Sequence, residues 1–118
     1  MAAAILYICT TCRRASEPDS VGIRPGFLLH QAIAAEAAPE GVTVVATECL
    51  SACKTGCAVA LTASGKYSYV YGYLDPDLHV TDILDGAARY AASVDGIVPW
   101  RERPTIFRKQ SIARIPPL

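Results

Sequence analysis

The 118-residue chain lacks the features that mark several large classes of protein. No stretch approaches the roughly 18 uncharged apolar residues that a membrane helix needs, so we expect no membrane association. The formal net charge is zero, which gives no electrostatic reason to expect nucleic acid as a partner. The apolar run at residues 1–8 has no basic residue before it, whereas a secretory signal begins with one. We therefore expect a cytoplasmic protein.

Catalytic motifs are also missing, because the sequence has no phosphate-binding loop and no nucleophile with an evident general base. We therefore expect no stand-alone enzyme. Charged residues are few, at 19%, against 52% apolar residues, a balance typical of a folded globule. The charges are unevenly spread: residues 1–100 carry six basic and ten acidic side chains, and residues 101–118 carry five and one. The sequence thus predicts an acidic domain over residues 1–98 and an extended, basic, proline-containing tail over 99–118 that packs on it.

Hydrophobic patterning predicts strands at residues 3–9, 42–47, 58–62 and 66–73, and helices at 27–38 and 80–94. The first strand, helix and second strand form a βαβ unit, which implies two parallel neighbouring strands with a right-handed crossover. The third and fourth strands flank a turn at Gly65, which is typical of a hairpin. The fold class that follows is α/β with a mixed β-sheet.

Cysteine, in contrast, is abundant for a chain expected in a reducing compartment. The five cysteines follow the pattern Cys9-x-x-Cys12 and Cys49-x-x-x-Cys53-x-x-x-Cys57. The first two predicted strands each lead onto a cysteine. Because parallel strands end at the same edge of a sheet, we expect the loops that carry these cysteines to meet there.

Thiolates in two close pairs can hold a zinc ion or a [2Fe-2S] cluster, since a cluster needs one pair for each iron. A thiol oxidoreductase is a further interpretation, and it would need only Cys9 and Cys12. Against it, a loop of more than ten residues separates Cys12 from the next predicted helix. In a thioredoxin the helix begins at the cysteine pair and lowers the thiol pKa. Buried cysteines with no metal are the least specific interpretation.

The order strand, cysteine pair, helix, strand, Cys49-x-x-x-Cys53, hairpin, helix resembles the thioredoxin-like [2Fe-2S] ferredoxins. Over nearly the whole chain, the sequence also resembles an uncharacterised bacterial family of predicted metal-binding proteins, some encoded near cobalamin-synthesis genes. The stretches that carry this second resemblance are Cys9-x-x-Cys12-Arg13, Cys49-Leu50-Ser51-x-Cys53-x-x-x-Cys57, Gly65-Lys66-x-x-Tyr69, Arg103-Pro104 and Ala113-Arg114-Ile115-Pro116.

These resemblances imply a thioredoxin-like sandwich with flanking helices and a one-electron carrier with a [2Fe-2S] cluster. They imply a redox partner protein and make a homodimer plausible. The expected cluster ligands are Cys9, Cys12, Cys49 and Cys53. Cys57 is then a spare thiol or an alternative metal ligand, since the ferredoxins usually have no cysteine near that position. Binding of zinc or cobalt instead of a cluster stays an alternative.

Other side chains have simpler interpretations. Four tyrosines alternate along the strand predicted at 66–73 and so share one of its faces: Tyr67, Tyr69, Tyr71 and Tyr73. Packing under a helix explains them, and a docking or dimer surface is the alternative. His30 and His79 are expected to be ordinary helix-face residues. The basic tail either covers an acidic face or steers a redox partner.

Overall fold

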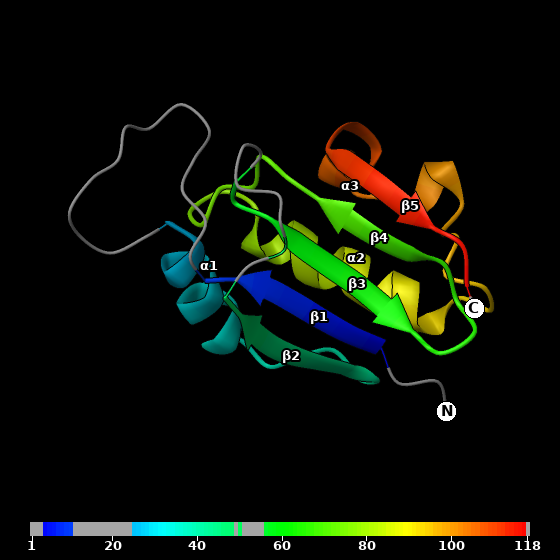
Figure 1. Cartoon of the computed structure of the whole chain (residues 1–118), viewed down its shortest axis with the longest axis horizontal. Helices are drawn as coiled ribbons and strands as arrows, with labels where there is room; N and C mark the ends of the chain where they lie inside the picture. Colours follow the sequence, from blue (N-terminus) through cyan, green and yellow to red (C-terminus); the bar gives the residue numbers. More distant parts are fainter. Residues whose placement is uncertain (1–3, 11–24, 49, 51–55, 118) are drawn as a thin grey trace.

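The computed structural model describes residues 4–10, 25–48, 50 and 56–117. Its elements form an α/β fold in which one sheet is covered by helices (Figure 1). In chain order they are β1 (Ala4–Cys9), α1 (Pro25–Ala34), β2 (Val42–Thr47), β3 (Val59–Ala63), β4 (Ser68–Tyr71), α2 (Val80–Ala92), the 3-10 helix η2 (Trp100–Glu102), α3 (Thr105–Lys109) and β5 (Ser111–Ile115). None of the helices described is long and apolar enough to span a membrane.

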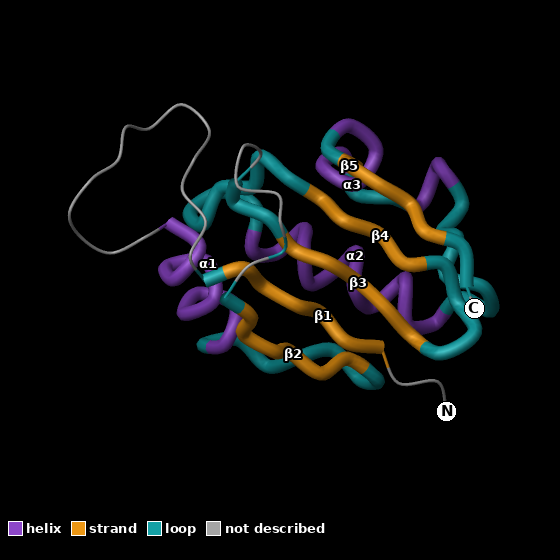
Figure 2. The backbone as a smooth tube through the Cα atoms, viewed as in Figure 1, coloured by secondary structure: helices purple, strands orange, loops and turns teal. Residues whose placement is uncertain are grey.

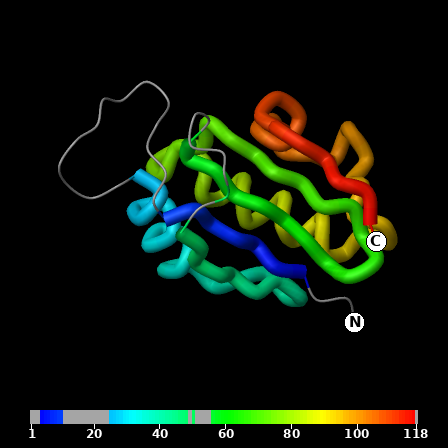
Figure 3. Tube along the Cα trace, viewed as in Figure 1, coloured from blue at the N-terminus to red at the C-terminus, as the bar shows by residue number. Residues whose placement is uncertain are grey.

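The five strands form one mixed sheet in the order β2-β1-β3-β4-β5. β1 and β2 pair in parallel, and the remaining neighbours are antiparallel. Figure 3 shows that the first strand of the chain lies inside the sheet, between β2 and β3. The predicted βαβ unit and mixed sheet are therefore confirmed, and β2 has the bounds expected from its β-branched run.

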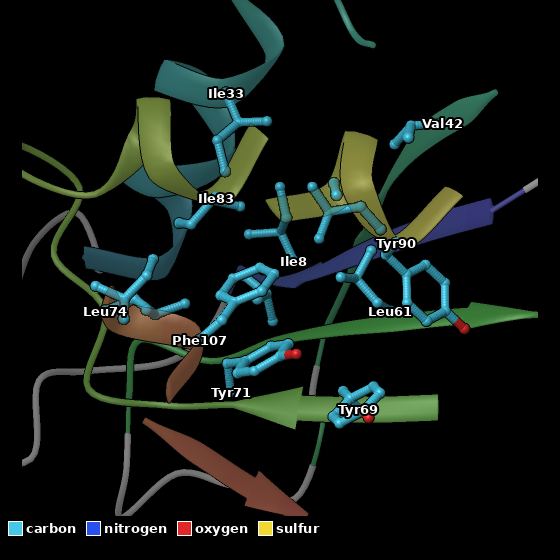
Figure 4. Packing of buried hydrophobic residues seen from close by; sticks show 14 of the residues in the cluster. Ile8, Ile33, Val42, Leu61, Tyr69, Tyr71, Leu74, Ile83, Tyr90 and Phe107 are labelled. Carbon is cyan, nitrogen blue, oxygen red and sulfur yellow. The ribbon is translucent and has the colours of Figure 1, made fainter. Parts of the chain in front are cut away.

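The core lies between the sheet and the helices, which Figure 2 shows running behind the strands. Side chains of β1 and β3 alternate, so that Leu6 and Ile8 meet Val59 and Leu61 on the helix side of the sheet. Helix α1 contributes Leu29 and Ile33 to the same core, and α2 contributes Ile83, Ala87 and Tyr90. Figure 4 shows these apolar groups interleaved. Because both helices bury side chains here, they lie on one face of the sheet.

Tyrosines of β4 complete this core from the other side of β3. The Tyr71 ring stacks on Phe107 with centroids 4.0 Å apart, and the Tyr69 ring meets Tyr90 edge to face at 6.3 Å (Figure 4). Tyr69 and Tyr71 are therefore core residues packed under a helix, as their alternation favoured. Tyr73 lies past the end of β4 and is half-exposed.

The C-terminal segment differs from the extended tail that we expected. Residues 100–115 form η2, α3 and β5, and β5 pairs with β4 as an edge strand of the sheet. Helix α3 is held by burial of Ile106 and Phe107. Phe107 lies directly against Gly86 of α2, where a side chain would collide with the ring. Burial of Ile106 and Phe107 against α2 thus stabilises a helix in a segment whose prolines predict irregular structure.

Candidate metal centre

Cys9 lies at the edge of the sheet where the two parallel strands end. It is the last residue of β1 and pairs with Thr47, the last residue of β2. The amide of Thr10 donates a hydrogen bond to the Thr47 carbonyl oxygen at 2.8 Å. The segments that follow β1 and β2 are therefore still adjacent at this point. The expectation that β1 and β2 end at the same edge of the sheet is confirmed.

A third segment joins this edge from later in the sequence. The amide of Cys9 donates to the carbonyl oxygen of Ala58 at 3.1 Å, which continues the β1–β3 ladder by one residue. The Cys9 thiol contacts the carbonyl oxygen of Glu48, with Sγ and O 3.5 Å apart. The backbone around Cys9 is therefore fixed by segments on both sides.

The Cys9 side chain is fully buried, and it lies apart from the main core. It packs with Ala58 and the partly buried Leu50 in a small separate cluster. Neighbouring residues of a strand point to opposite faces, so Ile8 faces the helices and Cys9 faces the other side of the sheet. A donor group of Cys9 would therefore serve a centre on the side away from α2.

Cys57 has a different environment from Cys9, although it lies two residues before the start of β3 and next to Ala58, which contacts Cys9. Its amide donates to the Leu74 carbonyl oxygen at 3.4 Å, and the Leu74 amide donates back to Cys57 at 3.1 Å. The side chain is fully buried in the main core, with Val59 and Leu61. The alternation of side chains along this segment separates Cys57 from Cys9 across the sheet.

The remaining predicted ligands, Cys12, Cys49 and Cys53, lie outside the described residues. Within the parts of the chain that are described, no cluster of three or more histidine, cysteine or acidic side chains could hold a metal ion. What is described is the frame around the predicted loops: Thr10, Glu48, Leu50 and Gly56 bound them. The described residues Cys9, Thr47 and Ala58 lie together at one edge of the sheet, and the ligand roles of the other cysteines stay predictions.

The helix ends at this edge contribute charges of both signs, because Asp82 lies in the first turn of α2. Both α1 and α2 begin at the end of the sheet where β1 finishes (Figure 1). The N-terminus of a helix carries a partial positive charge, and the first turn of α1 has no acidic side chain to neutralise it. At the start of α2, the His79 Nδ1 accepts a hydrogen bond from the Asp75 amide at 2.8 Å, so this histidine orders the turn before the helix.

The groups whose pKa is shifted lie in the core of the protein. Burial raises the pKa of Tyr71 above its usual range and raises the pKa of Tyr90 to about 12. Lys66 is buried with its ammonium group against the end of α2, and burial lowers its pKa, partly opposed by the charge of Asp95. No pattern in the sequence indicates a buried lysine, because a lysine beside a hairpin glycine is usually exposed.

Two solved structures have the same architecture, both of a thioredoxin-like [2Fe-2S] ferredoxin from Aquifex aeolicus. One has a TM-score of 0.62 at 18% identity, covering 97% of this chain and 94% of the ferredoxin. The other, of the wild-type ferredoxin, has a TM-score of 0.60 at 17% identity, covering 96% and 99%. At these identities the likeness establishes the fold, which is that of a thioredoxin-like ferredoxin.

The chain belongs to the family DUF1636, described as a protein of unknown function, which it matches over residues 6–117. No curated protein matches the sequence.

Proposed function

We propose that this protein binds a [2Fe-2S] cluster and carries single electrons between partner proteins. The observation that carries the proposal is the placement of Cys9 beside the end of β2, which leads directly into the segment with Cys49 and Cys53. When bound, such a cluster accepts and releases one electron. The likeness in fold to a ferredoxin supports the same function.

The proposed ligands are Cys9, Cys12, Cys49 and Cys53. In the sequence, Cys49 lies between two residues that contact Cys9. The Glu48 carbonyl oxygen lies 3.5 Å from the Cys9 sulfur, and Leu50 packs in the same small cluster as Cys9. Chain continuity then keeps Cys49 within reach of a centre that includes Cys9. Thiolates are soft donors that suit iron–sulfur clusters and zinc alike.

The position of Cys57 supports its exclusion from the ligand set. Its side chain lies in the helix-side core, whereas that of Cys9 lies on the opposite face of the sheet. It would have to leave a packed core to reach the same centre. We assign Cys57 to the core.

The burial of Cys9 also argues against a thiol oxidoreductase. A thiol that attacks a substrate disulfide needs access to solvent and a lowered pKa. Cys9 has no exposed surface, and its neighbours Ala58 and Leu50 are apolar. A metal ligand has no such need, because its partner is inside the protein.

The test is the metal content of protein purified without oxygen, with its visible spectrum. We expect about two irons and two acid-labile sulfides per chain, and a brown colour that bleaches on reduction. Stoichiometric zinc in a colourless protein, or stoichiometric cobalt without acid-labile sulfide, would replace the cluster by a metal-binding role. Metal-free protein that cannot be reconstituted would refute both.

Three cysteine variants assign the ligands in the same assay. Cys9→Ser and Cys49→Ser should each abolish the cluster, whereas the matched control Cys57→Ser should keep it. A reductase that used only Cys9 and Cys12 would survive Cys49→Ser, so retained disulfide reduction in that variant would support the thiol interpretation instead. Loss of the cluster in Cys57→Ser, with the fold intact by circular dichroism, would overturn our assignment.

A further inference from the structure

The C-terminal segment presents the single tryptophan of the chain to solvent. Trp100 opens η2 and is 59% exposed. Figure 1 shows η2 and α3 beside β5, on the far side of the sheet from β1 and β2. Two strands, β3 and β4, lie between this segment and β1, which carries Cys9.

Two arginines lie against the tryptophan ring. The guanidinium carbon of Arg103 is 5.4 Å from the ring centroid, and that of Arg108 is 6.0 Å away. Their Nε groups donate to the carbonyl oxygens of Val98 at 2.7 Å and of Trp100 at 3.0 Å. Backbone contacts thus hold both guanidinium groups in place before any ligand binds.

The charges around Trp100 are mostly positive. Arg101 and Lys109 are exposed on the same short helices. The one acidic residue there, Glu102, lies 3.7 Å from Arg89 of α2. In the described part of the chain, neither Arg103 nor Arg108 has a carboxylate partner.

We propose that Trp100, Arg103 and Arg108 form a docking surface for an acidic partner protein. Tryptophan and arginine are the side chains that most often dominate the energy of protein interfaces. Arg108 donates from Nε to the Trp100 carbonyl oxygen and from Nη2 to the Arg101 carbonyl oxygen at 3.1 Å, which orients the group. Its remaining N–H groups can donate to a carboxylate. Single-stranded nucleic acid is a less suitable occupant, because a base would have to stack where the guanidinium groups lie. The surface does not depend on the metal centre.

The test uses the fluorescence of Trp100, which reports on this surface alone because the chain has no other tryptophan. The probe is poly-L-glutamate at low salt, and the expected result is a saturable change in emission that weakens strongly as salt is added. Arg108→Gln should lower the affinity about tenfold, as expected for one lost charge-assisted contact. Arg108→Lys, which keeps the charge and loses the fork, should lower it by an intermediate amount.

The matched control is Arg114→Gln, which removes the same charge from β5, where Arg114 lies over Tyr67 at 5.1 Å. It should leave the affinity nearly unchanged. Equal losses in Arg114→Gln and Arg108→Gln, or no binding by the wild type, would overturn the proposal. Tighter binding of a thymidine oligonucleotide than of poly-L-glutamate would also overturn it, in favour of nucleic acid. Cys9→Ser should bind the probe like the wild type, so the two proposals fail separately.

Discussion

Gly86→Ala should destabilise the protein, although alanine is the better helix former. In an exposed helix the change would stabilise by about 1 kcal/mol. Here the new methyl group would lie 2.5 Å from the Cζ atom of Phe107 and closer still to a second ring atom. The ring cannot move away easily, because it is buried and stacks on Tyr71 at 4.0 Å. Such overpacking costs about 3 kcal/mol, which leaves a net loss of about 2 kcal/mol.

The assays are urea unfolding, which gives the free energy, and thermal unfolding, which gives Tm, both followed by far-ultraviolet circular dichroism. A net loss of 2 kcal/mol corresponds to a decrease in Tm of about 8 °C for a chain of this length. The decisive comparison is made in a Phe107→Leu background, where the smaller side chain leaves room for the methyl group. There Gly86→Ala should be neutral or stabilising, so its effect changes sign. Destabilisation of similar size in both backgrounds, or none in the wild type, would refute the reasoning from this contact.

Two further predictions concern the core. Lys66→Met should lower the free energy of unfolding, determined by urea unfolding, by about 1 kcal/mol. The reason is that the Lys66 ammonium group donates to the carbonyl oxygens of Tyr90 at 3.2 Å and Ala91 at 2.7 Å. A more stable variant would instead show that the cost of burying the charge dominates. Stability should also fall as the pH rises above 10, by about 1.4 kcal/mol per pH unit for each tyrosine with a raised pKa. The hydroxyl groups of Tyr71 and Tyr90 lose their protons at lower pH in the unfolded chain than in the folded protein. Tyr90→Phe should therefore weaken the dependence of stability on pH.

The strands that frame the metal centre could be predicted because their signals are local. β1 and β2 are short apolar, β-rich runs, and both end where a cysteine motif begins. Helix α2 could be predicted from its apolar spacing, and it ends at Ala92, two residues before the predicted end. Helix α1 ends at Ala34, four residues before the predicted end, because alanine-rich sequence continues past the last buried side chain.

The C-terminal elements could not be predicted in the same way. Helix α3 has five residues, too few to show a helical period. Its stability depends on Gly86 and Tyr71, which are distant in sequence. The Trp100 surface was missed for the same reason, since it arises only when η2 and α3 fold against each other. The hydrophobic pattern of a short stretch of sequence carries no information about contacts with residues far away in the sequence.

The ligand set was partly predictable. Cysteine spacing indicated which segments meet, and the location of Cys9 agrees with that. Spacing alone left the role of Cys57 open, because the third cysteine of a regular series looks like the others. Its face of the sheet separates it from Cys9. The roles of Cys12, Cys49 and Cys53 stay predictions that the cysteine variants test.

The inner position of β1 has a consequence for how the protein matures. Cys9 precedes Ala58 by 49 residues in the chain, yet its amide donates a hydrogen bond to the Ala58 carbonyl oxygen. The cysteine edge is therefore complete only after β3 has entered the sheet beside β1. A metal delivered to the growing chain would find isolated thiols, whereas one delivered after folding would find a frame held by hydrogen bonds on both sides. In the proposed function, insertion of the cluster would therefore follow the pairing of β1 with β3.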